Sequence, residues 1–225
     1  MADHRLEVLE DADAVHRRGA ELIAEAAKAD ISERAHFALA VSGGRDPWPM
    51  FSQLEDYELD WTKVEIFQVD ERVAQAGSDQ RNLTHLVESL SIGAQGSIRP
   101  MPVTDDDLEA AADRYAASLP EALDQAHLGI GPDGHCASLV PGDAVLDVTD
   151  KRVAVTAGEY QGVRRMTLTY PELHRVRRLL WVVTGEEKRD ALLKLLDRDP
   201  SIPAGRVDPG GDSLILADRA ASPDG

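Results

Sequence analysis

Short apolar segments alternate with amphipathic segments along the whole chain of 225 residues. The apolar segments are strand-like and are separated by stretches of helical period, a pattern that indicates an α/β fold in which helices cover both faces of a mostly parallel sheet. No repeat, low-complexity tract or long linker divides the sequence, so we expect a single domain over residues 1–225. The predicted strands cover residues 36–41, 64–69, 126–130, 152–155, 178–183 and 213–217.

Four segments show the three-to-four spacing of apolar residues that is typical of helices. The first begins after Asp11, a residue suited to cap it, and continues through Ala27. The last has acidic residues before basic ones, an order that suits the helix dipole. After the first helix, the predicted helices cover residues 81–90, 107–119 and 186–198.

The formal net charge is -17 at pH 7. This excess of acid disfavours nucleic acid or an anionic membrane as a partner, because both bind basic surfaces. The longest apolar runs are only strand-length, and the first residues lack the apolar segment of a secretory signal. We therefore expect a cytoplasmic protein without a membrane partner.

The single cysteine, Cys136, excludes an intrachain disulfide, and we expect it to be a small packing residue.

Unusual residues follow four of the predicted strands. In parallel α/β sheets the carboxyl ends of the strands share one edge, and ligands bind in the crevice there. We therefore expect segments that are distant in the sequence to converge on one site. They are Ser42-Gly43-Gly44, Asp70-Glu71-Arg72, the GPDGH segment that ends at His135, and Thr184-Gly185.

These segments carry groups suited to an anionic substrate. The glycines after Ser42 leave backbone N–H groups bare, and Arg72 offers bidentate contacts to a phosphate. Asp70 is suited to position a water or a histidine, and the imidazole of His135 is suited to proton transfer at neutral pH. Taken alone, the glycine turn and the charged strand end are also typical of ordinary surface structure.

Two further cations stand out. Arg165 opens a strand-like segment, and Lys188 lies in the first turn of the last predicted helix. A lysine there opposes the helix dipole, so contact with an anion explains it as well as simple solvation does. The other histidines show no metal-ligand spacing and no Cys/His cluster is present, so we expect no metal site.

Six ordered segments together resemble the 6-phosphogluconolactonase family and span nearly the whole chain. The resemblance implies the Rossmann-like open α/β fold that this family shares with glucosamine-6-phosphate deaminase, ribose-5-phosphate isomerase and CoA-transferase-like proteins. It also implies hydrolysis of 6-phospho-D-glucono-1,5-lactone to 6-phospho-D-gluconate in the oxidative pentose phosphate pathway, without a cofactor. The segments are VSGG, VDER, LGIGPDGHCASLVPG, RRMTLTYPEL, VTGEEK and IPAGRV.

The resemblance also implies roles for individual residues. His135 matches the general base, and Asp70 lies beside the reacting centre. One departure affects the glycine loop, where Arg45 and Asp46 stand in place of the Ser-Thr pair usual in the family. Either Arg45 compensates by folding inward or Asp46 points away from the phosphate. The residues implied to bind the phosphate are Ser42, Gly43, Gly44, Arg72, Arg165 and Lys188.

Two other functions fit part of the pattern. An isomerase or deaminase of the related fold shares the glycine loop and the Asp-Gly-His element, but usually has Asp-Glu-Tyr where this chain has Asp-Glu-Arg. A sugar-phosphate-binding sensor domain without catalysis is suggested by the altered glycine loop, although His135 and the absence of a DNA-binding segment argue against it. We expect a monomer or a weak homodimer that acts on a small phosphosugar lactone.

Overall fold

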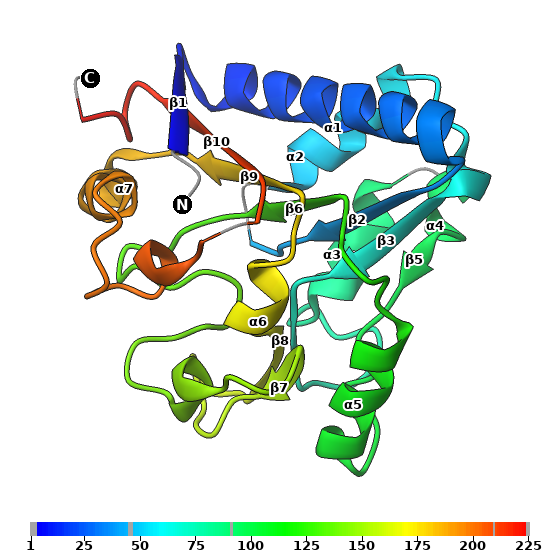
Figure 1. Cartoon of the computed structure of the whole chain (residues 1–225), viewed down its shortest axis with the longest axis vertical. Coiled ribbons are helices and arrows are strands. Elements are labelled where there is room, and N and C mark those ends of the chain that lie inside the picture. Colours follow the sequence, from blue (N-terminus) through cyan, green and yellow to red (C-terminus); the bar gives the residue numbers. More distant parts are fainter. Residues whose placement is uncertain (1–3, 45–46, 91, 209, 224–225) are drawn as a thin grey trace.

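Parallel strands form a seven-stranded central sheet in the computed structural model, which describes residues 4–44, 47–90, 92–208 and 210–223 (Figure 1). Their order is β1-β10-β9-β6-β2-β3-β5. This confirms the predicted open parallel α/β fold. The strands are β1 (His4–Leu9), β2 (Phe37–Val41), β3 (Val64–Gln68), β5 (Ile98–Arg99), β6 (Gln125–Leu128), β9 (Arg178–Val183) and β10 (Asp212–Asp218).

Helices cover both faces of this sheet, because alternate residues of each central strand point to opposite sides. In β2, Ala38 and Ala40 pack into one apolar core, whereas Leu39 and Val41 pack into the other. The core around Leu39 is covered by α1 (Ala12–Arg34), α2 (Pro47–Ser52), α3 (Asn82–Ser89) and α4 (Ile92–Gln95). The opposite core is covered by α5 (Leu108–Ser118), α6 (Tyr170–Leu173) and α7 (Arg189–Leu196).

The predicted helices are present with shifted ends. The side chain of Asp11 accepts a hydrogen bond from the Ala14 backbone N–H at 2.8 Å and caps α1 as expected, but the helix continues to Arg34. The last predicted helix begins as a short 3-10 turn that contains Lys188 and precedes α7. None of the described helices is long and apolar enough to cross a membrane. Short 3-10 turns cover Gln53–Asp56, Trp61–Lys63, Ala144–Asp147, Glu186–Lys188 and Ala204–Arg206.

A second, antiparallel sheet lies beside the carboxyl edge of the first and corrects one prediction. It consists of β4 (Asp70–Arg72), β8 (Arg165–Leu168) and β7 (Val153–Val155), in the order β4-β8-β7. The segment predicted as a parallel strand at 152–155 therefore pairs antiparallel with β8 in this small sheet. A short apolar run marks a strand, but it does not specify the partner.

Two strands of the central sheet were not predicted. β1 is an edge strand whose residues are partly exposed, so its sequence mixes polar and apolar side chains without a long apolar run. β5 has two residues and lies at the other edge. Edge strands bury little, and the hydrophobic signal that identifies central strands is correspondingly weak.

Candidate active site

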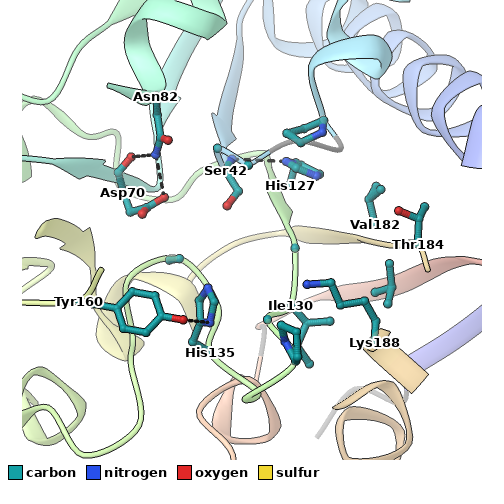
Figure 2. Close-up of a pocket in the computed structure, with 18 of the residues that line it drawn as sticks. Ser42, Asp70, Asn82, His127, Ile130, His135, Tyr160, Val182, Thr184 and Lys188 are labelled. Carbon is teal, nitrogen blue, oxygen red and sulfur yellow. Dashed lines mark hydrogen bonds between the residues drawn. The ribbon is translucent and has the colours of Figure 1, made fainter. Parts of the chain in front are cut away.

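A polar cavity of about 440 Å³ opens where the central sheet meets the small sheet (Figure 2). It is lined from the ends of β2, β6 and β9 and from β4 and β8, so the four segments predicted to converge do share one site. Every residue predicted for the site lines this cavity: Ser42, Gly43, Gly44, Asp70, Arg72, His135, Arg165 and Lys188.

The loop that bears His135 is folded tightly by its glycines. Gly131 N–H donates to the His135 carbonyl at 2.9 Å, and Gly134 N–H donates to the Gly131 carbonyl at 2.9 Å. A side chain at Gly131 would place its Cβ 2.1 Å from His135 Nδ1, so only glycine lets the imidazole fold back over the loop. The late Pro-Ala segment supports the loop from behind, since Ala204 N–H donates to the Gly134 carbonyl at 2.9 Å.

Asp133 holds the imidazole of His135 from the same loop. His135 Nδ1 lies 2.6 Å from Asp133 Oδ1, which places the ring proton on Nδ1 and leaves Nε2 facing the cavity, away from Tyr160 (Figure 2). Burial opposes ionisation of Asp133, but the hydrogen bond and charge of His135 outweigh it and lower the pKa of this carboxyl. The loop therefore presents an imidazole backed by an ionised carboxylate, an arrangement suited to general-base chemistry.

Tyr160 completes this group from the loop between β7 and β8. Its hydroxyl donates to Asp133 Oδ2 at 3.2 Å and lies 3.4 Å from His135 Nδ1. Sequence reasoning found neither Asp133 nor Tyr160. The position of Asp133 within the glycine-rich motif was an available signal for it, whereas nothing in the loop sequence GEYQG marks Tyr160 as part of the site.

Asp70 lies in the buried wall of the cavity. The Ser138 hydroxyl donates to Asp70 Oδ2 at 2.6 Å, and Asn82 Nδ2 donates to the Asp70 carbonyl at 3.1 Å and to Oδ1 at 3.4 Å. Burial raises the pKa of the Asp70 carboxyl, against the opposing hydrogen bond of Ser138 and charge of Arg165. A carboxylate kept in such a costly environment is typical of a functional position.

Two guanidinium groups lie beside Asp70, because Arg72 on β4 and Arg165 on β8 are paired in register. Arg72 Nη1 donates to Asn82 Oδ1 at 2.7 Å and to the Gln80 carbonyl at 3.1 Å. Arg165 Nη2 donates to the Tyr160 carbonyl at 3.0 Å. Both side chains are thus fixed by neutral acceptors that leave their positive charge available to a ligand.

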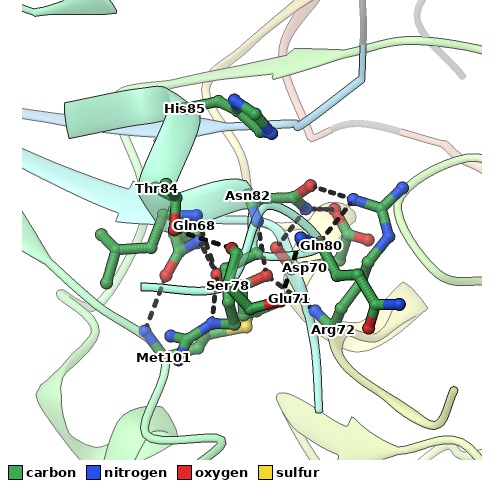
Figure 3. Close-up of polar contacts among 12 residues, drawn as sticks. Gln68, Asp70, Glu71, Arg72, Ser78, Gln80, Asn82, Thr84, His85 and Met101 are labelled. Atoms are coloured by element: carbon green, nitrogen blue, oxygen red, sulfur yellow. Dashed lines mark hydrogen bonds and ion pairs between the residues drawn. The ribbon is translucent and has the colours of Figure 1, made fainter. Parts of the chain in front are cut away.

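Glu71, between these two site residues, faces the interior and holds the wall together (Figure 3). It is fully buried, with 0% of its surface exposed, and pairs with Arg81 Nε at 3.0 Å. Nothing in the run Asp70-Glu71-Arg72 marks its middle residue as structural. Its carboxylate accepts hydrogen bonds from Gln68 Nε2 at 2.9 Å and from the backbone N–H groups of Arg72 at 2.7 Å, Asn82 at 2.8 Å and Leu83 at 2.9 Å.

The glycine loop after β2 forms another part of the cavity lining. Ser42 N–H donates to His127 Nδ1 at 3.3 Å, so this backbone donor already has a partner. Burial lowers the pKa of His127 to about 3, and the ring is therefore neutral. Gly43 packs against Asn82, whose side chain lies 2.2 Å from where a Cβ would stand. The departure at residues 45 and 46 falls outside the described residues.

Lys188 reaches the cavity from the 3-10 turn after β9. Gly185 adopts a positive φ of 93°, and its N–H donates to both carboxylate oxygens of Asp218 at 3.1 Å, which fixes the start of this turn. Figure 2 shows the lysine side chain extending over Ile130 toward the open space. In the part of the chain that the structure describes, Lys188 has no ion pair, so its charge is free for an anionic ligand.

The fold and the cavity define an open α/β protein with an imidazole–carboxylate pair and three cations at the carboxyl edge of its sheet. The chain belongs to the glucosamine-6-phosphate isomerases/6-phosphogluconolactonase family, whose sequence model matches residues 10–216. This confirms the predicted family.

Individual relatives agree with this assignment. A 6-phosphogluconolactonase of Nostoc sp. is 32% identical over 96% of each chain, and one of Synechocystis sp. is 34% identical over 85% of each chain. The crystal structure of 6-phosphogluconolactonase from Thermotoga maritima superposes with a TM-score of 0.87 at 27% identity, covering 96% of this chain and 100% of the other.

Proposed function

We propose that this chain hydrolyses 6-phospho-D-glucono-1,5-lactone to 6-phospho-D-gluconate, a step of the oxidative pentose phosphate pathway. The observation that carries the proposal is the short His135–Asp133 contact in a cavity that also holds Arg72, Arg165 and Lys188. The pair supplies a base, and the cations suit a phosphorylated substrate. Relatives with at least 32% identity over most of the chain are named for this activity.

The reaction proceeds by attack of water on the lactone carbonyl. His135 Nε2 removes a proton from the water as its oxygen bonds to the carbonyl carbon, and Asp133 stabilises the imidazolium that forms. The tetrahedral intermediate then collapses, the bond from this carbon to the ring oxygen breaks, and the imidazolium returns the proton to that oxygen. Because a lactone is an activated ester, no covalent enzyme intermediate is required.

The rest of the cavity binds and orients the substrate. Arg72, Arg165 and Lys188, together with the loop Ser42-Gly43-Gly44, hold the phosphate, and Asp70 lies beside the reacting centre. A phosphate fixed far from the carbonyl orients the lactone, so remote binding energy lowers the barrier at the reacting end. Backbone N–H groups of the glycine turns or a nearby cation stabilise the developing oxyanion, a contribution of about 3 kcal/mol per donor in other hydrolases.

We also infer which partners the enzyme lacks, its compartment and its oligomeric state. With a net charge of -17, the chain lacks the overall basic charge that nucleic acid or an anionic membrane attracts. We infer a single-domain cytoplasmic enzyme that is a monomer or a weak homodimer.

The test is a pH-stat assay, or a coupled dehydrogenase assay, of the purified protein with freshly made lactone. We expect opening of the lactone far above its spontaneous rate. Release of ammonia from glucosamine 6-phosphate would instead favour the deaminase. Binding of 6-phosphogluconate without accelerated opening would favour a sensor, and either result would overturn the proposal.

A further inference from the structure

Tyr160 occupies a position between the base and one of the cations that no family motif in this sequence marks. It lies in the loop from β7 to β8, where Gln161 and Gly162 adopt positive φ values of 56° and 82°. Tyr160 N–H donates to the Val163 carbonyl at 3.0 Å, which closes this tight turn. The side chain is thereby held against the cavity, half-buried, from a short loop of defined geometry (Figure 2).

The hydroxyl of Tyr160 engages the carboxylate of Asp133. It donates to Oδ2 at 3.2 Å, while Oδ1 of the same carboxylate lies 2.6 Å from His135 Nδ1. The Tyr160 and His135 rings also pack together, with centroids 5.2 Å apart. Because both oxygens of Asp133 have a partner, the carboxylate cannot rotate without losing one, and the imidazole that it orients is fixed with it.

Tyr160 also contacts Arg165, through both its ring and its backbone carbonyl. The guanidinium carbon lies 5.4 Å from the centroid of the tyrosine ring, within the range of a cation–π contact. Arg165 Nη2 also donates to the Tyr160 carbonyl at 3.0 Å. One residue therefore contacts both the carboxylate behind the base and a cation of the cavity wall.

We propose that Tyr160 is a positioning residue with two separable effects: its hydroxyl orients the Asp133–His135 pair for proton transfer, and its ring holds Arg165 in place for the substrate phosphate. The proposal deepens the function given above and rests on it. It predicts that loss of the hydroxyl changes turnover, whereas loss of the ring also changes substrate binding.

The test compares Tyr160→Phe with Tyr160→Leu in steady-state lactone hydrolysis. Loss of one hydrogen bond to a charged group predicts a decrease of kcat by about tenfold in Tyr160→Phe, with KM little changed. Tyr160→Leu should show the same decrease of kcat and, because the cation–π contact is lost, a KM raised by about fivefold. Tyr57→Phe is the matched control, since Tyr57 packs under Lys28 away from the cavity and should leave both constants unchanged.

A second measurement separates this proposal from the proposed function, because it needs no turnover. The titration of His135 is followed by NMR in wild type and Tyr160→Phe, with His135→Ala used to assign the signal. Without the hydroxyl, the negative charge of Asp133 is shared less, so the imidazolium is stabilised more and the titration midpoint of His135 moves to higher pH. The other charged groups among the described residues that line the cavity are unchanged in this variant: Asp70, Arg72, Arg165, Glu187 and Lys188.

The outcomes are distinct. A wild-type protein without lactonase activity overturns the proposed function, and the shift of the His135 midpoint still decides the role of the hydroxyl. An unchanged kcat and an unchanged midpoint in Tyr160→Phe overturn the positioning of the base. A KM in Tyr160→Leu equal to that of Tyr160→Phe overturns the positioning of Arg165.

Discussion

The two walls of the cavity are built differently. The wall formed by β4 and α3 is buried and densely hydrogen-bonded, with the carboxylate of Glu71 at its centre. The opposite wall consists of loops and a 3-10 turn, where His135, Tyr160 and Lys188 are partly exposed. The comparison indicates that the first wall fixes the shape of the site and the second performs the chemistry. Substitutions should therefore affect mainly stability in the first wall and mainly kinetics in the second, except at Asp70 and Arg72, which line the cavity from the first wall.

Glu71→Ala should show the largest effect on folding. The substitution leaves the Arg81 guanidinium and several backbone N–H groups buried without their acceptor, so we expect the free energy of unfolding to decrease by about 3 to 5 kcal/mol. Urea denaturation followed by circular dichroism measures it. The control is Glu65→Ala, whose partly exposed carboxylate pairs with Arg99 at 3.0 Å and should cost about 1 kcal/mol or less. Equal losses in the two variants would contradict a structural role for Glu71.

Arg72→Ala should affect substrate binding most strongly. Removal of a charged donor that we propose contacts the phosphate predicts a KM raised about 10- to 100-fold, with a smaller change in kcat. Initial rates over a range of lactone concentrations measure both constants, and Arg99→Ala at the far edge of the sheet is the control. An unchanged KM in Arg72→Ala would remove this residue from the phosphate site.

Asp70→Asn tests the other exception to the comparison, a carboxyl group in the buried wall whose burial costs stability. Since burial raises the pKa of Asp70 above its unfolded value, the ionised carboxylate destabilises the folded state at neutral pH. The cost disappears as pH falls below the unfolded pKa, where the group is protonated in both states. We therefore expect Asp70→Asn to raise the free energy of unfolding by about 1 kcal/mol near pH 7 and by about zero near pH 3.

The measurement for Asp70→Asn is urea denaturation at both pH values, together with lactone turnover, which should fall. A variant that is less stable than wild type at neutral pH would show that the ionised carboxylate contributes to folding instead of opposing it.

Lys188→Ala should show the smallest effect. The side chain has no ion pair in the described part of the chain, so the free energy of unfolding should change by less than about 0.5 kcal/mol. The loss of one flexible cation should raise KM by about threefold to tenfold. Lys194→Ala, on the exposed side of α7, is the matched control. A KM for Lys188→Ala within error of this control would exclude contact with the phosphate.

The sequence predicted the convergence of the site because that prediction needs only topology. The segments that begin at Ser42, Asp70 and Thr184 follow apolar runs, and the carboxyl ends of parallel strands share one edge. The contacts of Tyr160 and Glu71 depend instead on side-chain direction within short antiparallel strands and tight turns. The pairing of Arg72 with Arg165, which sets those directions, has no signature in the order of residues.

Errors in the fold have a related cause. The segment at 152–155 has the composition of a strand, but its partner is β8, reached through the same loop that carries Tyr160. Local composition predicts that a segment is extended and buried, but it does not predict which strand pairs with it. The small antiparallel sheet, and with it the Tyr160 contact, therefore emerges only from the three-dimensional structure.

Turnover of fresh 6-phospho-D-glucono-1,5-lactone by His135→Ala, measured beside wild type in a pH-stat, tests the central claim most directly. Loss of the general base predicts a kcat lower by about 100- to 10,000-fold, while equilibrium binding of 6-phosphogluconate and the free energy of unfolding stay close to wild type. A kcat within about twofold of wild type, in a variant that binds and folds normally, would contradict the assignment of the chemistry to the loop wall.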